Sequence, residues 1–217
     1  MILAAGRGSR LAPLTDELPK PLLDVHGQPL IERQVVALAA AGYERVVINL
    51  FHLGQMIEAA LGDGSRFGVE IVYSREPEPL ETGGALAYAR DLLGEAPFAL
   101  INGDIWTDFD FAALPTPGPH VDAHLVLTPA TAAQRDEGDF ALAHRRVHRP
   151  QAVADRTWVY CGISAMTCGL IGDRTGRHSL REPLFVAAAA GRLSGQAFYG
   201  EWIDIGTPAQ LRRARGA

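Results

Sequence analysis

The order of strand-like and helix-like segments constrains the fold of this chain more than any other feature of the sequence. Short apolar runs rich in β-branched residues indicate strands at Met1–Ala5, Val46–Leu50, Val69–Tyr73, Phe98–Ile101 and Ala123–Thr128. Helical patterns lie between the first four runs, at Leu30–Ala41, Gln55–Leu61 and Gly84–Leu93. Such alternation predicts an α/β fold: a mainly parallel sheet with helices on both faces and ligand sites at the carboxyl ends of the strands.

After about residue 128 the pattern becomes less regular. Candidate elements there are strands at Phe140–Ala143, Trp158–Ser164 and Ser194–Tyr199 and a helix at Leu184–Ala190, which we interpret as additions to the same sheet. Thr207-Pro208 supplies an N-cap and a proline in the first turn, and predicts a final helix. Because 217 residues suffice for one sizeable core, we expect a single three-layer αβα domain over residues 1–217.

Composition and charge argue against several classes of protein. Hydrophobic residues make up 47% of the chain, but no apolar run reaches the about 18 residues of a membrane span. The N-terminus lacks the basic start and cleavage site of a signal peptide, so we expect a cytoplasmic protein. A net charge of −5 opposes broad nucleic-acid binding. Cys161 and Cys168 form no Cys-x-x-Cys motif, and we interpret both as packing residues.

A glycine-rich loop follows the first predicted strand. Gly6 and Gly8 let the backbone approach phosphate oxygens, Ser9 adds a hydroxyl donor, and the N–H groups can form an anion-binding nest. Arg10 and Lys20 add cations that can neutralise phosphate charge. The loop has neither the Gly-x-x-x-x-Gly-Lys-Ser/Thr of a P-loop nor the third glycine of a dinucleotide fingerprint. It predicts a nucleoside triphosphate site of another kind.

Two isolated acids are candidate metal ligands. Asp104 follows the apolar strand Phe98–Ile101 within Asn102-Gly103-Asp104, where an α/β sheet presents its ligand site. Asp204 stands between two isoleucines, where a buried carboxylate needs a partner. A shared Mg²⁺ would satisfy both acids, because magnesium takes oxygen ligands and bridges to phosphates. A plain turn with Gly103 would also account for Asp104.

The string Leu80-Glu81-Thr82-Gly83-Gly84-Ala85 opens a predicted helix after the third strand. Its backbone N–H groups and the Thr82 hydroxyl would be available to a polar ligand there. A helix start capped by Thr82 explains the string equally well. His144 and His148, four apart beside several arginines, suit a metal only on a helix, and we interpret them as solvated basic residues.

Taken together, the motifs resemble the sugar-phosphate nucleotidyltransferase family. The resemblance rests on Gly-x-Gly-Ser-Arg-Leu-x-Pro-Leu-Thr from Gly6, Pro19-Lys20-Pro21-Leu22, Leu80-Glu81-Thr82-Gly83-Gly84 and Trp202-Ile203-Asp204-Ile205-Gly206-Thr207-Pro208, and it extends over nearly the full chain. It implies a nucleotide-binding portion at about 1–128 and a sugar-phosphate-binding portion at about 129–217. It also implies catalytic roles for Arg10 and Lys20 and makes Asp104 and Asp204 the Mg²⁺ ligands.

The same resemblance implies two further sets of site residues. The residues expected to contact the nucleotide are Leu3, Ala4, Ala5, Gly6, Gly8, Ser9, Glu81, Thr82 and Gly83. Those expected to contact the sugar phosphate are Asn49, Asn102, Tyr160, Gly162 and Glu182. Cys161 stands where relatives often have Ala or Ser.

Within the family, the chain is most similar to short members that act on N-acetylmuramate 1-phosphate. The implied reaction joins UTP and this sugar phosphate to a UDP-sugar and pyrophosphate, in peptidoglycan recycling. The sequence shows no C-terminal β-helix or long coiled coil for trimerisation, and a monomer is expected.

Three alternatives remain open at the level of sequence. Glucose 1-phosphate or mannose 1-phosphate, with another base, would suit a related enzyme. A metal-dependent glycosyltransferase could use the Asp-x-Asp spacing of Asp108-Phe109-Asp110, with Phe109 and Phe111 on a helix against the sheet. A non-catalytic regulatory homologue would keep the fold without the chemistry.

Overall fold

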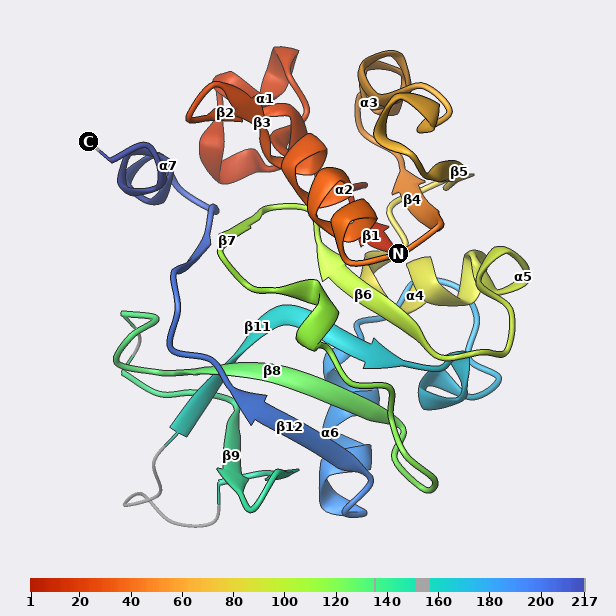
Figure 1. Ribbon diagram of the computed structural model, residues 1–217, viewed down its shortest axis with the longest axis vertical. Helices are drawn as coiled ribbons and strands as arrows, with labels where there is room; N and C mark the ends of the chain where they lie inside the picture. The colour runs from red at the N-terminus through yellow and green to blue at the C-terminus, as the bar shows by residue number, and fades with distance from the viewer. Residues whose placement is uncertain (135, 151–156, 217) are drawn as a thin grey trace.

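A nine-stranded sheet forms the centre of the molecule (Figure 1). The computed structural model describes residues 1–134, 136–150 and 157–216. Within them the strand order is β5-β4-β1-β6-β11-β8-β12-β10-β9. The strands in this order are β5 (Glu70–Arg75), β4 (Arg45–Leu50), β1 (Ile2–Leu3), β6 (Phe98–Asn102), β11 (Thr157–Met166), β8 (Ala123–Pro129), β12 (Leu193–Ala197), β10 (Arg146–His148) and β9 (Phe140–Ala143).

Strand direction divides the sheet into two halves. β5, β4, β1 and β6 run parallel, as the alternation in the sequence predicts. β11 lies antiparallel to β6 on one side and to β8 on the other. β12 is parallel to β8, and β10 and β9 complete the far edge by antiparallel pairing. The strand over Ala123–Thr128 therefore does not continue the parallel run, because β11 lies between it and β6.

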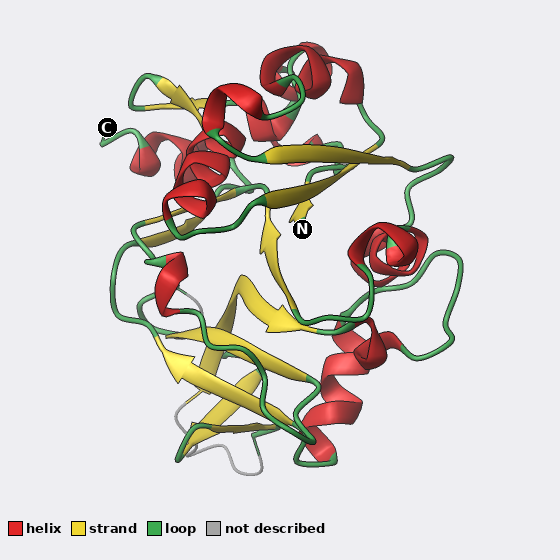
Figure 2. Ribbon diagram, turned by 45° about the vertical axis from the view of Figure 1, so that its right-hand side comes forward, coloured by secondary structure: helices red, strands yellow, loops and turns green. Residues whose placement is uncertain are grey.

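Helices cover both faces of the sheet (Figure 2). Neighbouring residues of each strand point to opposite faces, so each face has apolar side chains that the helices bury. Leu100 packs in the cluster that includes α4 (Glu81–Tyr88) and α6 (Arg181–Ala189). Ile101 packs in the cluster that includes α2 (Leu30–Ala40) and α3 (Gly54–Leu61). The predicted three-layer α/β architecture is confirmed.

A third, smaller apolar cluster ties the N-terminal loop to the last helix. Leu11 packs with Ile203, Ile205 and Leu211, which belong to β13 (Trp202–Asp204), the turn after it and α7 (Pro208–Ala214). β13 pairs with β7 (Ile105–Thr107) in a separate two-stranded sheet. Residues near the start and the end of the chain are thereby brought together.

The remaining elements are short. They are α1 (Leu14–Glu17), α5 (Arg90–Leu93), the strand pair β2 (Asp24–Val25) and β3 (Gln28–Pro29), and 3-10 turns at Ser9–Leu11, Lys20–Leu22, Ser65–Phe67, Phe111–Ala113 and Cys168–Ile171. Within the described residues, no helix combines the length and the apolar character needed to cross a membrane. Both cysteines are free and buried, which confirms that they are packing residues.

Several element boundaries differ from the sequence prediction. The first strand ends at Leu3, because the Ala4 N–H donates to the Asn49 side chain at 2.8 Å. The helix predicted from Gly84 begins at Glu81, so Thr82 lies inside it and is not its cap, and a second short helix follows Ala89. Phe111 starts a single 3-10 turn instead of a helix.

Candidate active site

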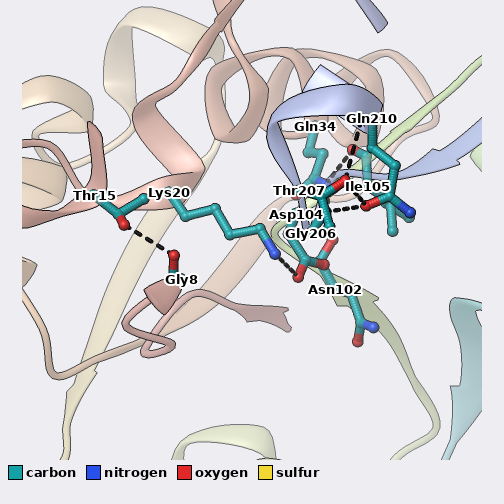
Figure 3. A network of polar contacts seen from close by, with 10 residues as sticks. All are labelled: Gly8, Thr15, Lys20, Gln34, Asn102, Asp104, Ile105, Gly206, Thr207 and Gln210. Carbon is teal, nitrogen blue, oxygen red and sulfur yellow. Dashed lines mark hydrogen bonds and ion pairs between the residues drawn. The ribbon is translucent and has the colours of Figure 1, made fainter. Parts of the chain in front are cut away.

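The glycine-rich loop folds back on itself beside the sheet edge. Gly8 has a left-handed φ of 63° and precedes the 3-10 turn that carries Arg10. The Thr15 hydroxyl donates to the Gly8 carbonyl at 2.9 Å (Figure 3). A Cβ on Gly8 would lie 3.0 Å from Thr15 Cγ2 and 3.2 Å from Lys20 Cβ, so only glycine suits both the backbone and the space.

Lys20 and Asp104 form an ion pair at the edge where the first strands end. Lys20 Nζ lies 2.5 Å from Asp104 Oδ2, and the lysine is 7% exposed (Figure 3). The other carboxylate oxygen, Asp104 Oδ1, is buried and has no hydrogen-bond partner in the part of the chain that the structure describes. A buried acceptor without a partner is costly, and a cation would satisfy it.

A buried glutamine and a glycine hold the turn that presents Asp104. Gln34 on α2 donates through Nε2 to the carbonyls of Asn102 at 2.9 Å and Ile105 at 3.2 Å. The Gly103 N–H donates to the Leu3 carbonyl, and a Cβ on Gly103 would lie 2.6 Å from that oxygen. The turn between β6 and β7 is therefore fixed from the helix side and from β1.

Asp204 lies beside this turn because β13 pairs with β7. Asp204 stands opposite Ile105, and the Ile205 N–H donates to the Asp104 carbonyl at 2.9 Å. Arg10 packs against Gly206, because a Cβ built on this glycine would lie 2.6 Å from Arg10 Nη2. Both predicted acids and both predicted cations thus lie around one pair of short strands.

The donor set suits a metal held by few protein groups. Among the described residues, no cluster of three or more His, Cys, Asp or Glu side chains could hold an ion. Two carboxylates match Mg²⁺, which commonly takes one or two protein carboxylates and completes its shell with waters and substrate phosphates.

A pocket of about 300 Å³, here called the central pocket, opens next to the ion pair. Its lining residues are Leu3, Ala5, Gly6, Asn49, Glu76, Pro79, Leu80, Glu81, Thr82, Asn102 and Asp104. Five residues expected at the nucleotide are among them: Leu3, Ala5, Gly6, Glu81 and Thr82. Ala4 is buried behind the loop, and Gly8, Ser9 and Gly83 are not in the lining.

The donors near the start of α4 differ from the expectation. The N–H groups of Gly83 and Gly84 already donate to the His178 carbonyl, at 2.9 and 3.0 Å. The Thr82 hydroxyl accepts from the Leu180 N–H at 2.9 Å and keeps its own proton to donate. The Gly83 N–H is therefore already used within the protein, and the contact of Gly83 with the nucleotide stays a prediction.

Glu76 and Asn49 form a buried polar bridge at the base of the central pocket. Asn49 Nδ2 donates to Glu76 Oε1 at 2.7 Å, and the Leu80 N–H donates to Glu76 Oε2 at 3.1 Å. Burial raises the pKa of the Glu76 carboxyl, although these hydrogen bonds act in the opposite sense. Asn49 is 3% exposed and its oxygen accepts from the Ala4 N–H, so it supports the loop. It also lines the central pocket, and its contact with the sugar phosphate stays a prediction.

A second pocket, here called the side pocket, has a volume of about 220 Å³ and shares Leu3, Thr82 and Asn102 with the central pocket. It is lined by Leu3, Thr82, Leu100, Asn102, Asp139, Phe140, Tyr160, Ser179, Leu180, Arg181, Leu184 and Phe185. A third pocket of about 200 Å³ contains Asp204, Gly162, Tyr160 and Asn102. Asn102 is common to all three.

Three of the residues expected at the sugar phosphate meet where β6 and β11 adjoin. β11 bulges between Tyr160 and Ser164, and Gly162 has a φ of +71°. A Cβ there would lie 2.6 Å from Asn102 Nδ2, so the glycine makes room for that side chain. The Tyr160 hydroxyl forms a hydrogen bond with the Ser164 hydroxyl at 2.7 Å, and burial raises the pKa of Tyr160.

Glu182 does not join this group. Its side chain is 78% exposed and lies 4.0 Å from Arg174 on the outer surface. It is absent from the lining of the side pocket, where the acid is Asp139. The residue before it, Arg181, lines the side pocket with a side chain that is 66% exposed, and the contact of Glu182 with the sugar phosphate stays a prediction.

The two acids of the Asp-x-Asp spacing have structural partners. Asp108 Oδ1 accepts from the Glu201 N–H at 2.7 Å. Asp110 Oδ1 accepts from the Ala112 N–H at 2.9 Å and caps a 3-10 turn. Neither acid lines the central pocket, and these contacts do not favour the glycosyltransferase alternative.

Comparison with known proteins decides the family. The family described as Nucleotidyl transferase matches residues 1–140, more than half of the chain. The chain belongs to the nucleotidyl transferase family. The membership predicted from the motifs is therefore confirmed.

Relatives of this nucleotidyltransferase cover most of its length. It is 42% identical to N-acetylmuramate alpha-1-phosphate uridylyltransferase of Neisseria meningitidis, with 99% of this chain and 96% of the relative aligned. The protein of the same name from Caulobacter vibrioides is 34% identical, with 96% and 91% aligned. A mannose-1-phosphate guanylyltransferase catalytic subunit beta from Danio rerio is 32% identical, but this chain spans 61% of it.

Solved structures agree with the fold of this nucleotidyltransferase. HddC from Yersinia pseudotuberculosis has a TM-score of 0.77 at 23% identity, covering 99% of this chain and 96% of that one. UDP-glucose pyrophosphorylase from Acinetobacter baumanii has a TM-score of 0.76 at 17% identity, covering 99% and 90%.

Four residues around the site lie outside the sequence prediction: Gln34, Glu76, Asp139 and Arg181. Gln34 had a readable signal, because it lies on the helix face shared by Ile31, Val35 and Leu38, where a polar residue is unusual. The other three reach the pockets through loop and strand pairings that local sequence does not specify.

Proposed function

We propose that this chain makes a UDP-sugar and pyrophosphate from UTP and N-acetylmuramate 1-phosphate. The Lys20–Asp104 pair, with one carboxylate oxygen left unpartnered beside two adjoining pockets, carries the proposal of nucleotidyl transfer. The 42% identity over nearly equal lengths supports the choice of uridylyl and N-acetylmuramate groups. A role in peptidoglycan recycling in the cytoplasm, as a monomer, belongs to the same proposal.

The reaction needs no covalent intermediate. An oxygen of the sugar 1-phosphate attacks the α-phosphorus of UTP, a new O–P bond forms, and the bond to the β-phosphate oxygen breaks with its electron pair leaving on pyrophosphate. Lys20 would neutralise the α-phosphate or the attacking group, and Arg10 the leaving pyrophosphate. Catalysis then comes from positioning and charge stabilisation.

Asp104 and Asp204 would hold the magnesium ion. Bound there, it would bring the two phosphates together and offset the charge that develops between them. Asp104 Oδ1 would supply one ligand, and Lys20 keeps the other oxygen of the same carboxylate in place. Gln34 contributes indirectly, because it fixes the backbone on both sides of Asp104.

The central pocket would receive the nucleotide and the two adjoining pockets the sugar phosphate. This assignment agrees with a nucleotide-binding portion at about 1–128 and a sugar-phosphate-binding portion at about 129–217. Asn102 lines all three pockets and would lie between the two substrates. Other sugar phosphates and other bases remain outcomes of the test.

A panel of nucleoside triphosphates and sugar 1-phosphates, assayed by pyrophosphate release with magnesium, tests the proposal. We expect UTP with N-acetylmuramate 1-phosphate to give the highest kcat/KM. Asp104→Asn and Lys20→Ala should each lose on the order of a hundredfold in turnover while staying folded. Asp108→Asn, which keeps the acceptor for Glu201, is the matched control and should stay near wild type.

Three results would count against the proposal. Near-normal pyrophosphate release from Asp104→Asn or Lys20→Ala would remove the assigned chemistry. Sugar transfer from a preformed UDP-sugar, without pyrophosphate formation from UTP, would favour the glycosyltransferase alternative. Nucleotide binding without turnover on any sugar phosphate would indicate a regulatory homologue.

A further inference from the structure

The side pocket contains a group of charges that nucleotidyl transfer does not use. Arg181, the first residue of α6, lines this pocket, and its Nη2 donates to Asp139 Oδ1 at 2.8 Å. The guanidinium carbon lies 4.7 Å from the ring centre of Phe185. A second arginine, Arg149, lies over the same ring, at 3.7 Å. Two guanidinium groups therefore converge on one aromatic side chain at the pocket.

The position of Arg181 is electrostatically unusual. The N-terminal end of a helix carries a partial positive charge, so an arginine in the first turn is not favoured by the helix that bears it. Among the described residues, Arg149 and Arg181 beside Phe185 face one carboxylate, that of Asp139, and Arg149 lies outside the pocket lining. Two cations against one described acid favour an anion beside Phe185.

The shape of the Arg181 guanidinium group indicates which kind of anion would fit. Its planar fork of five N–H donors matches a carboxylate in a bidentate arrangement. Asp139 accepts from Nη2 and so helps to orient the group. The rest of the pocket is largely apolar, with Leu100, Leu184 and Phe185 in its lining. A sugar with an acidic substituent and an apolar methyl group would match both parts.

We propose that Arg181 is the specificity-determining residue that binds the carboxylate of the lactyl ether on N-acetylmuramate 1-phosphate. This inference rests on the proposed function. The substrate class is a hexosamine 1-phosphate that carries a carboxylate, as distinct from N-acetylglucosamine 1-phosphate, which has the same ring and amide without the lactyl group. Asp139 acts as a positioning residue for the guanidinium.

The test compares the two sugar phosphates in wild type and in Arg181→Gln. We expect the variant to lose about 10- to 100-fold in kcat/KM for N-acetylmuramate 1-phosphate, mainly through KM, because a charge-assisted hydrogen bond is lost. The value for N-acetylglucosamine 1-phosphate should change by less than about twofold. Where that sugar is not turned over, its inhibition constant against N-acetylmuramate 1-phosphate gives the same comparison.

Arg174→Gln is the matched control, because it removes an exposed cation from the same region that does not line the pocket. Arg181→Lys keeps the charge without the fork and should fall between wild type and Arg181→Gln. Equal losses for both sugars, or no loss for either, would overturn the role of Arg181. Failure of wild type to release pyrophosphate from N-acetylmuramate 1-phosphate would instead refute the proposed function.

Discussion

Glycines set the positions of both cations at the proposed site. Gly8 takes a left-handed conformation in contact with Lys20, and Gly206 has no side chain where the Arg10 guanidinium lies. The two glycines act differently. Gly8 is required by its backbone conformation as well as by space, whereas Gly206 is required only by the approach of Arg10. A substitution at Gly206 therefore separates catalysis from folding.

Gly206→Ala should lower turnover with little effect on stability. The added Cβ would lie 2.6 Å from Arg10 Nη2, and the end of this exposed side chain can move away at small cost. We expect the free energy of unfolding to stay within about 0.5 kcal/mol of wild type. Displacement of the cation should lower kcat about 10- to 100-fold.

Urea unfolding and pyrophosphate release measure the two effects. Gly118→Ala is the control, because nothing lies within 4 Å of the added Cβ. Unchanged kcat in Gly206→Ala would show that Arg10 does not act from its present position.

At the scale of elements, β13 carries Asp204 and α7 follows it on the same side of the site. The Thr207 hydroxyl accepts from the Gln210 N–H at 3.3 Å, and Gln210 Oε1 accepts from the Gly206 N–H at 3.0 Å. The pair is a variant of the capping box, because Gln210 bonds the N–H of the residue before the N-cap and not that of Thr207. Leu211 packs the helix against Leu11 of the glycine-rich loop. The helix start predicted from Thr207-Pro208 is confirmed, and it also fixes the loop that carries Arg10.

Thr207→Ala should destabilise the protein by about 1 kcal/mol, the usual cost of losing an N-cap side chain. Thr207→Ser keeps the hydroxyl and should remain near wild type. Urea unfolding of the three proteins gives the comparison, and hydrogen exchange should locate the loss in α7 and β13. Equal stabilities for the Ala and Ser variants would contradict a capping role.

At the scale of the whole molecule, the site lies where the sheet changes direction. The parallel strands end at β6, β11 runs the other way, and Asn102 and Gly162 face each other across this junction. In an α/β sheet ligands commonly bind where the strand order reverses, which in this sheet is between β1 and β6, next to the junction. The β6–β11 pairing joins the two halves, and polar contacts between β8 and β12 help to hold the far half together.

His124 makes the stability of this half dependent on pH. On β8, its ring nitrogens contact Ser194 at 2.8 Å and Gln196 at 3.2 Å on β12. Burial, and the positive charge of Arg145, lower its pKa below 6.5, although the Gln196 hydrogen bond acts against the shift. The unfolded chain then binds more protons between the two pKa values, so stability is lost as the pH falls through about 6.5.

His124→Asn keeps a polar side chain on β8 but removes the titration. We expect the loss of unfolding free energy between pH 7.5 and pH 5.5, measured in urea, to be smaller in the variant than in wild type. An identical loss in both proteins would show that His124 does not contribute to the pH dependence.

The fold of the first half and the polar groups at strand ends could be predicted from sequence because both depend on local patterns. Asp104, Lys20 and Asp204 stand out as charged residues at the borders of apolar runs. The place of β11 could not be predicted, because its antiparallel pairing with β6 is a contact between distant segments. The same holds for Arg181 and Glu182: one residue of helix register decides which of them reaches the pocket.

The shared wall of the central and side pockets has a consequence for inhibition. Leu3, Thr82 and Asn102 border both cavities, so the two cavities adjoin each other. A single molecule that fills both would lose its translational and rotational freedom only once, and its second half would bind at a high effective concentration. Linked uridine and acidic-sugar fragments are therefore a rational starting point for a bisubstrate inhibitor of this chain.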